Sequence, residues 1–167
     1  MLTYISGGQR SGKSRYAQDL ALQHSPNPVY LATSRAWDDD HRQRIARHVA
    51  DRDARWTTLE EEKYPSRLAL AGRTVVLDCV TLWLTNFFAD AEYDVDTALE
   101  QAKAEFDKLL LLDCNLLVIS NELGMGLHAT TDAGRKFTDL QGWLNQHIAQ
   151  RADRAIFMVS GLPLVVK

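Results

Sequence analysis

The stretch that decides the fold reads Gly7-Gly8-Gln9-Arg10-Ser11-Gly12-Lys13-Ser14, and it directly follows the apolar run Leu2-Thr3-Tyr4-Ile5. It has the phosphate-loop pattern G-x-x-x-x-G-K-[ST], here between an expected strand and an expected helix. Glycines at both ends let backbone N–H groups curl around a phosphate, and the following helix directs its positive N-terminus at the same anion. We therefore predict a nucleotide-binding site. Its members are Gly7, Gly8, Gln9, Arg10, Ser11, Gly12, Lys13 and Ser14.

Two of these residues have predicted roles in chemistry. Lys13 is expected to bridge the β- and γ-phosphates as a catalytic residue, and Ser14 to ligate Mg²⁺. A second magnesium ligand is expected in Asp78, which ends the apolar run of residues 74–77. An isolated Asp at a strand end is more often a helix cap or a turn residue, but a phosphate loop in the same chain favours metal binding. We predict that Asp78 holds Mg²⁺ directly or through a water and belongs to the nucleotide site.

Size and charge limit the partners. The 167 residues have the length of one domain, so we expect residues 1–167 to form a single nucleotide-binding unit. The chain has 19 Lys and Arg against 22 Asp and Glu, a formal net charge of −3. Because nucleic-acid-binding proteins normally show a basic excess, we expect no nucleic acid as partner.

The apolar segments indicate a cytoplasmic protein. The first apolar run stops at Gly7, and the richest later one, residues 109–119, is interrupted by Asp113 and Asn115. Neither suits a signal peptide or a membrane-spanning helix, so no membrane insertion is expected. Cys79 and Cys114 lack metal-site spacing and are expected to be buried thiols, at a strand interior and a strand entrance respectively.

Short apolar runs alternate with helical stretches along the chain. Strands are expected over residues 2–6, 29–32, 74–80, 116–120 and 155–159, with further candidates at 56–59 and 164–166. Helices are expected over residues 13–23, 38–49, 82–88, 96–112 and 132–151. The strands are apolar almost throughout, which is typical of strands covered on both faces. The pattern predicts an α/β protein of the P-loop NTPase type, with a mostly parallel sheet and helices on both faces.

Residues 38–52 combine four arginines with two histidines. At helical spacing His41, Arg44 and His48 share one face, which is suited to binding several phosphates. A neutral imidazole on that face is also a potential nucleophile toward phosphorus. On spacing alone, however, a basic helix is more often a solvated surface, so both interpretations remain open at this point.

Polar residues also follow the expected strand at 116–120. The sequence Ser120-Asn121-Glu122-Leu123-Gly124-Met125-Gly126 should emerge at the carboxyl edge of the sheet, where open α/β sheets bind ligands. An ordinary strand-to-helix connection is equally compatible with this pattern. Arg135, Asp139 and Asn145 follow within one long helix, as anion contacts or as surface residues.

Beyond the phosphate loop, the chain carries a series of short motifs in a fixed order. They are Tyr30-Leu31-Ala32-Thr33; Arg44-Ile45 with His48, Arg52, Trp56 and Glu60; Asp78-Cys79-Val80-Thr81 with Asn86; residues 121–126; Arg135 with Phe137 and Asp139; Gly142 with Asn145-Gln146; and Val159-Ser160-Gly161. Each is weak alone. Together, over nearly the whole chain, they resemble the bifunctional adenosylcobinamide kinase/adenosylcobinamide-phosphate guanylyltransferase family of cobalamin biosynthesis.

The resemblance implies one kinase/guanylyltransferase domain that performs two successive reactions. The first phosphorylates the aminopropanol hydroxyl of adenosylcobinamide with ATP or GTP, and the second transfers GMP from GTP onto that phosphate. By matching position, His48 becomes guanylylated as an intermediate, which gives this catalytic residue the role of a nucleophile. Arg44, Arg47 and Arg52 would stabilise the transferring group.

The resemblance also implies further nucleotide contacts and an assembly. The implied nucleotide-binding residues outside the phosphate loop are Thr33, Ser34, Arg35, Arg52, Glu60 and Asp78. Mg²⁺ is the implied cofactor, and a homotrimer the implied assembly. The chain departs from the family pattern at Leu127-His128, where an apolar residue and Pro are usual.

Two other functions are weighed against this one. In a P-loop small-molecule kinase without guanylyl transfer, His48 would be a bystander on a surface helix. A GTPase-type switch would need the guanine-reading sequence N-K-x-D, which the chain lacks.

Overall fold

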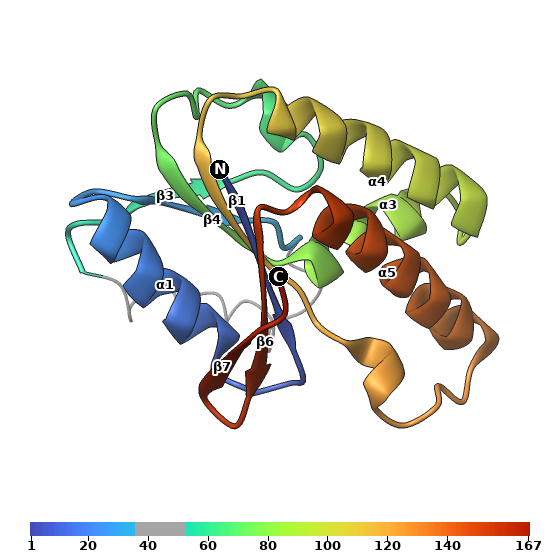
Figure 1. Ribbon diagram of the computed structural model, residues 1–167. Helices are drawn as coiled ribbons and strands as arrows, with labels where there is room; N and C mark the ends of the chain where they lie inside the picture. The colour runs from blue at the N-terminus through green and yellow to red at the C-terminus, as the bar shows by residue number, and fades with distance from the viewer. Residues whose placement is uncertain (36–52) are drawn as a thin grey trace.

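The computed structural model describes residues 1–35 and 53–167, whose strands form one seven-stranded sheet in the order β3-β2-β4-β5-β1-β6-β7 (Figure 1). The strands are β1 Leu2–Gly7, β2 Val29–Ala32, β3 Thr57–Glu60, β4 Thr74–Asp78, β5 Asn115–Ile119, β6 Arg154–Val159 and β7 Leu162–Val165. All neighbouring pairs are parallel except β6 and β7. The predicted α/β class with a mostly parallel sheet is confirmed.

Helices cover both faces of the sheet, as predicted. They are α1 Lys13–His24, α3 Val80–Asp90, α4 Val95–Leu110 and α5 Asp132–Arg151, with short 3-10 turns η1 Pro65–Arg67 and η2 Leu123–Met125. α1 lies on one face, and α3, α4 and α5 lie on the other (Figure 1). Each face has its own apolar core, the smaller one under α1 and the larger one under the other three helices.

The central strand β1 positions the site. All six of its residues are buried, because β5 and β6 flank it in the sheet and helices cover both faces. Ile5 pairs with Ile119 of β5 on one side and with Ile156 of β6 on the other. This register brings the carboxyl ends of β1, β4 and β5 to one edge of the sheet, which is where ligands bind in open α/β folds.

Two sequence predictions about the end of β4 were wrong. The strand stops at Asp78 instead of residue 80, and α3 begins at Val80 instead of residue 82. Cys79 is therefore buried at the strand-to-helix junction and not within a strand. The run is apolar on either side of this junction, and periodicity alone does not separate a buried strand from the first turn of a buried helix.

The two less certain strand candidates are both present, each shifted by one or two residues. The candidate at 56–59 is β3, and the one at 164–166 is β7. β7 starts earlier than predicted because Ser160 (φ 50°) and Gly161 (φ 85°) form a two-residue turn between β6 and β7. Two successive positive φ angles are typical of the tight hairpin turn that matches strand twist. The helix predicted over residues 38–49 lies outside the described residues.

Candidate nucleotide-binding site

The phosphate loop connects β1 to α1 at the carboxyl edge of the sheet. Gly7 has φ 152°, and a Cβ there would lie 2.7 Å from the carbonyl oxygen of Met158. Gly12 has φ 94°, and a Cβ there would lie 3.2 Å from Cα of Gly161. Both positions therefore require glycine. Among the described residues none caps the N-terminus of α1 with a side chain, so its backbone N–H groups remain available for an anion.

Lys13 is buried within this loop. Its Nζ donates to the carbonyl oxygens of Gly7 at 3.0 Å and Gly8 at 2.6 Å, and lies 3.5 Å from Oγ of Ser11. Burial lowers the pKa of the ammonium group, while nearby Cys79, Asp78 and Glu122 act in the opposite direction. The lysine thus lies at the centre of the loop that was predicted to surround a phosphate.

The two predicted magnesium ligands are in direct contact. Ser14 Oγ donates to Oδ2 of Asp78 at 2.9 Å, and the hydroxyl of Tyr30 donates to the same oxygen at 2.6 Å. Mg²⁺ prefers hard oxygen ligands, takes only one or two of them from protein when phosphates are present, and keeps water in the other positions. The hydroxyl and carboxylate beside the phosphate loop therefore fit this metal. Sequence reasoning missed Tyr30, whose approach to Asp78 follows from the pairing of β2 with β4.

Thr33 and Ser34 continue from β2 at the same edge. Thr33 is fully buried, donates its hydroxyl to the carbonyl of Cys79 at 2.9 Å, and accepts at its own carbonyl from Nδ2 of Asn86 at 2.9 Å. Ser34 Oγ donates to the carbonyl of Arg35 at 3.2 Å. The threonine therefore fixes the path of the backbone next to Asp78.

Arg35 lies in a cluster of charges that joins three segments. Its Nε bonds Glu62 at 2.7 Å, its Nη1 bonds Asp90 at 2.9 Å, and Lys63 Nζ bonds the same Asp90 carboxylate at 3.0 Å. Hydrogen bonds from Arg35 and Lys63 hold the pKa of Asp90 at about 2, and the hydrogen bonds of Arg35 to Asp90 and Glu62 raise the pKa of its guanidinium. The cluster fixes the end of α3 against the segments that follow β2 and β3.

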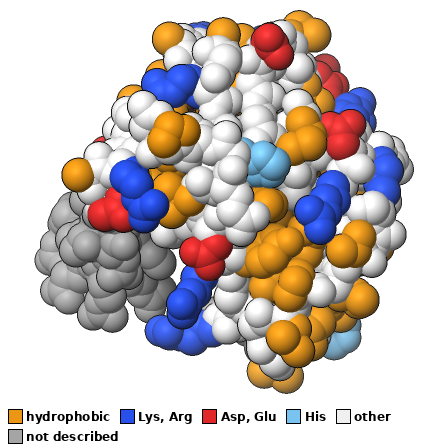
Figure 2. Space-filling view, turned by 60° about the vertical axis from the view of Figure 1, so that its left-hand side comes forward, with side chains coloured by type: hydrophobic (Ala, Val, Ile, Leu, Met, Phe, Trp, Pro, Cys, Tyr) orange, Lys and Arg blue, Asp and Glu red, His pale blue; other side chains and the backbone are white. Residues whose placement is uncertain are grey.

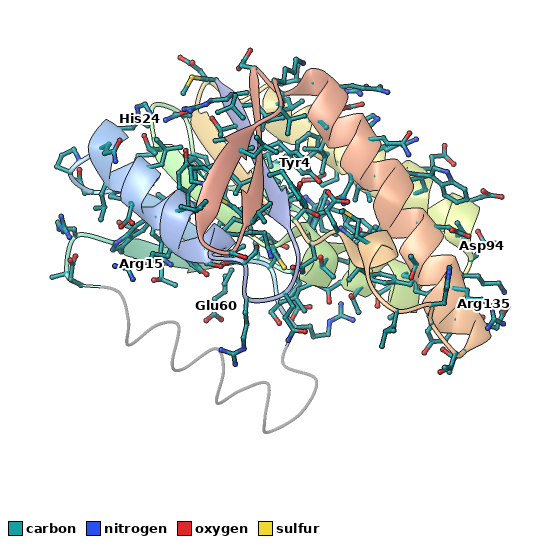
Figure 3. The ribbon with its side chains drawn as sticks, turned by 60° about the horizontal axis from the view of Figure 1, so that its bottom comes forward. Tyr4, Arg15, His24, Glu60, Asp94 and Arg135 are labelled. Atoms are coloured by element: carbon teal, nitrogen blue, oxygen red, sulfur yellow. The ribbon has the colours of Figure 1, made fainter. Side chains whose placement is uncertain are left out.

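Glu60, another predicted nucleotide contact, is exposed at the end of β3, the strand at one side of the sheet. Figure 3 shows it well apart from Tyr4, which lies between the central strands and α5. His48 and Arg52, together with Arg44 and Arg47, lie outside the described residues. Their predicted roles stay predictions.

The loop after β5 contacts the phosphate loop directly. The backbone N–H of Glu122 donates to the carbonyl of Gly7 at 3.2 Å, and the Tyr4 hydroxyl donates to Oε1 of Glu122 at 3.3 Å. Burial, reinforced by this carboxylate, raises the pKa of the Tyr4 phenol, so that it remains a donor. The predicted emergence of residues 120–126 at the carboxyl edge is correct.

A buried polar network supports this loop from α5. Ser120 Oγ donates to Oδ1 of Asn145 at 2.6 Å, Asn145 Nδ2 donates to the carbonyl of Asn121 at 3.0 Å, and Asn121 Nδ2 donates to Oγ1 of Thr81 at 2.9 Å. Gln141 adds a bond to Ser120 Oγ at 2.8 Å. No sequence pattern indicated Gln141, because its burial depends on which face of α5 meets the sheet.

The N-terminal part of α5 borders a hollow of about 180 Å³ beneath the 123–129 loop. Arg135 and Asp139 line it together with Gly126 and His128. Figure 3 shows Arg135 near the start of α5, away from the central strands. These two residues, which the sequence left open as anion contacts or surface residues, therefore line a hollow that includes no phosphate-loop residue.

A protein-family model described as "Cobinamide kinase / cobinamide phosphate guanyltransferase" (CobU) matches residues 3–166. The chain belongs to the CobU family. The match therefore covers the phosphate loop, Asp78 and the loop after β5 in a single alignment. It confirms the family that the order and spacing of the sequence motifs predicted.

Curated relatives agree with the CobU assignment over their full lengths. The bifunctional adenosylcobalamin biosynthesis protein CobP of Pseudomonas aeruginosa is 40% identical over 175 residues, covering 100% of this chain and 98% of the relative. The proteins named CobU from Escherichia coli and Salmonella typhimurium are 34% and 32% identical over 182 residues, with both chains of each pair fully covered. Among the helices of residues 1–35 and 53–167, none combines the length and apolarity needed to cross a membrane.

Proposed function

We propose that this protein phosphorylates adenosylcobinamide with ATP or GTP and then transfers GMP from GTP to the product, giving adenosylcobinamide-GDP. The observation that carries the proposal is the family match over residues 3–166, which coincides with a complete phosphate loop and its partner Asp78 in the structure. The kinase half uses nucleotide bound at that loop. The transferase half proceeds through guanylylated His48.

In the kinase half, the phosphate loop binds the triphosphate through backbone N–H groups and the N-terminus of α1. Lys13 exchanges its bonds to the carbonyls of Gly7 and Gly8 for phosphate oxygens. Ser14 and Asp78 would hold Mg²⁺, which, when bound, neutralises phosphate charge. Tyr30 orients the Asp78 carboxylate through its 2.6 Å bond, and thereby fixes which oxygen faces the serine.

In the transferase half, His48 attacks the α-phosphorus of GTP and releases pyrophosphate. The cobinamide phosphate then displaces GMP from the imidazole. Dividing the substitution into two steps through a labile phosphoramidate is ordinary nucleophilic catalysis. The proposed nucleotide contacts are completed by Thr33, Ser34, Arg35, Arg52 and Glu60. The charge cluster around Arg35 supports this proposal, because it fixes the segment that carries Thr33, Ser34 and Arg35.

The proposed assembly is a homotrimer in the cytoplasm, without nucleic acid as partner. Exposed apolar side chains on β7 and beside it support self-association, since Leu162, Leu164 and Val166 are 70%, 57% and 68% exposed at one edge of the sheet. Figure 2 shows exposed hydrophobic side chains gathered into a patch beside charged ones. Such patches are typical of interaction surfaces.

The decisive experiment is to incubate the protein with Mg²⁺ and GTP labelled at the α-phosphate, and to separate it on a denaturing gel. The proposal requires an acid-labile, alkali-stable label on the wild type that is absent from His48→Ala. His24→Ala, which removes an exposed histidine at the end of α1, is the matched control and should label normally. GTP labelled at the γ-phosphate should leave no label.

The same experiment separates the proposal from the alternative. Phosphorylation of cobinamide without any α-label on the protein would identify a P-loop small-molecule kinase that lacks guanylyl transfer. A wild-type protein that binds nucleotide but neither phosphorylates cobinamide nor transfers GMP would overturn the proposed substrate.

A further inference from the structure

Glu122 carries a carboxylate beside the phosphate loop. It follows β5, the strand next to the phosphate-loop strand β1, and its backbone N–H donates to the carbonyl of Gly7. Its charge acts on Lys13 together with that of Asp78. A carboxylate repels phosphate, so its presence beside a phosphate loop calls for a chemical role other than anion binding.

The surroundings hold this carboxylate in a defined position. Tyr4 is 4% exposed and donates its hydroxyl to Oε1 at 3.3 Å, which leaves Oε2 without that contact. The preceding residue, Asn121, is fixed through its carbonyl by Asn145 and through its amide by Thr81. A buried phenol and a buried amide network therefore position a half-buried carboxylate at the edge of the site.

The two proposed half-reactions place different demands on the protein. The hydroxyl that receives the phosphoryl group in the first reaction must lose its proton. The acceptor in the second is already an anionic phosphate, which needs no base. A residue that serves only as proton acceptor should therefore matter to the kinase half alone.

We infer that Glu122 takes the proton of the cobinamide hydroxyl during phosphoryl transfer and that Tyr4 positions it. The inference rests on the proposed function and names a residue for a step which that proposal leaves open. As the hydroxyl oxygen forms its bond to the γ-phosphorus, the bond to the leaving nucleoside diphosphate breaks. The hydroxyl proton moves to the Glu122 carboxylate and then to solvent.

Among the described residues near this edge, Asp78 and Asp90 are engaged elsewhere, and Glu60 ends the outermost strand β3, which β2, β4 and β5 separate from β1. Asp78 Oδ2 accepts from Ser14 and Tyr30 on the α1 side of the sheet. Asp90 is bonded to Arg35 and Lys63. Tyr4 belongs to the core on the opposite face from α1, so Glu122 and Asp78 are held from different sides of the sheet around Lys13.

The test uses Glu122→Gln, which keeps the shape and an oxygen for Tyr4 but removes the basic carboxylate. The kinase assay follows transfer from γ-labelled ATP to adenosylcobinamide, and the guanylylation assay follows label from α-labelled GTP on the protein. We expect kcat for the kinase to fall by about 100-fold or more, with guanylylation and transfer to ready-made cobinamide phosphate at the wild-type rate. Glu100→Gln, the same change on the exposed side of α4, should alter neither.

Two results would overturn the inference. One is an unchanged kinase rate in Glu122→Gln. The other is an equal fall of kinase and guanylylation, which would assign Glu122 to nucleotide or metal binding instead. A wild type that labels on His48 but does not phosphorylate cobinamide would refute the kinase half of the proposed function, a failure distinct from these two.

Tyr4→Phe tests the positioning role with a second variant. It removes one hydroxyl and keeps the buried ring, so the kinase kcat should fall while the KM for ATP and the guanylylation rate stay unchanged. A purely structural tyrosine would instead affect both half-reactions together, and that result would remove Tyr4 from the mechanism. Urea unfolding of each variant confirms that the comparison is made between folded proteins.

Discussion

Ser14 in the first turn of α1 and Asp78 at the end of β4 are joined by a hydrogen bond of 2.9 Å between the serine hydroxyl and the carboxylate. The bond links residues 64 positions apart and connects the phosphate loop to the neighbouring half of the sheet. In the proposed magnesium site, both oxygens turn to the metal. The relationship therefore predicts the consequences of removing either partner.

Replacing Asp78 with Asn should weaken Mg²⁺-dependent nucleotide binding and leave metal-free binding almost unchanged. The neutral amide retains a hydrogen-bonding partner for Ser14 but contributes no charge to the metal. We expect the Mg²⁺ requirement to rise by about 10- to 100-fold, measured as the Mg²⁺ concentration at half-maximal kinase rate. Tyr30→Phe, which removes only the second donor to Asp78, should have a smaller effect in the same direction.

Replacing Gly7 with Ala should destabilise the protein and abolish nucleotide binding. The new Cβ would lie 2.7 Å from the Met158 carbonyl at a φ of 152°, a conformation unfavourable to L side chains. We expect the free energy of unfolding to fall by about 1–3 kcal/mol in urea titrations.

Gly142→Ala is the matched control, since a Cβ there meets no atom within 4 Å. That substitution lies inside α5 and should stabilise by about 0.5–1 kcal/mol. Equal effects at the two positions would contradict the explanation.

Asp90 should make a pH-dependent contribution to stability. Its pKa of about 2 lies below the ordinary value of 3.8, so the folded state favours the ionised form. The stabilisation is fully present above pH 4 and is lost as the pH falls toward 2. Because Asp90 is 38% exposed, solvent screening makes the effect smaller than the pKa shift alone would indicate. Urea unfolding at several pH values checks this: Asp90→Asn should be less stable than wild type at pH 7, with a gap that closes between pH 4 and 2.

Replacing Asn145 with Ala should destabilise both the core and the 121–126 loop. The change removes the acceptor of the Ser120 hydroxyl proton and the donor to the carbonyl of Asn121, while Gln141 still donates to Ser120 Oγ. Unsatisfied buried polar groups cost about 1–3 kcal/mol each, so the free energy of unfolding should fall by about 2–4 kcal/mol. Gln146→Ala is the control on the same helix, because that residue is exposed. If Asn145→Ala unfolds at the wild-type urea concentration, the network does not support the loop.

Local patterns predicted much of the fold and of the site. The phosphate loop, the parallel sheet and Asp78 all follow from short sequence stretches whose chemistry is set by immediate neighbours. The contacts of Tyr30 with Asp78 and of Tyr4 with Glu122 were not predictable, because they depend on strand register and on which side of the sheet each ring occupies. The predicted boundary between β4 and α3 was wrong for a related reason. The run is apolar and mostly buried on either side of this junction, so its residues do not show the spacing that separates a strand from a helix.

Arg35 shows a second limit of sequence reasoning. The resemblance implied a nucleotide contact, and the structure surrounds its guanidinium with Glu62 and Asp90. Those partners lie 27 and 55 residues away along the chain, so no local pattern indicates them. The predicted nucleotide role of Arg35 stays a prediction.

The position of β1 in the sheet has a consequence for biosynthesis of the chain. β1 is synthesised well before β6, yet it pairs with that strand, and Gly7 packs against Met158 of β6. Pairings between such distant segments form late in folding. A nascent chain therefore exposes its phosphate loop without complete support until β6 has been synthesised. Nucleotide binding should begin only once β6 is in place, and nucleotide would then act as a ligand that selects chains whose sheet is complete.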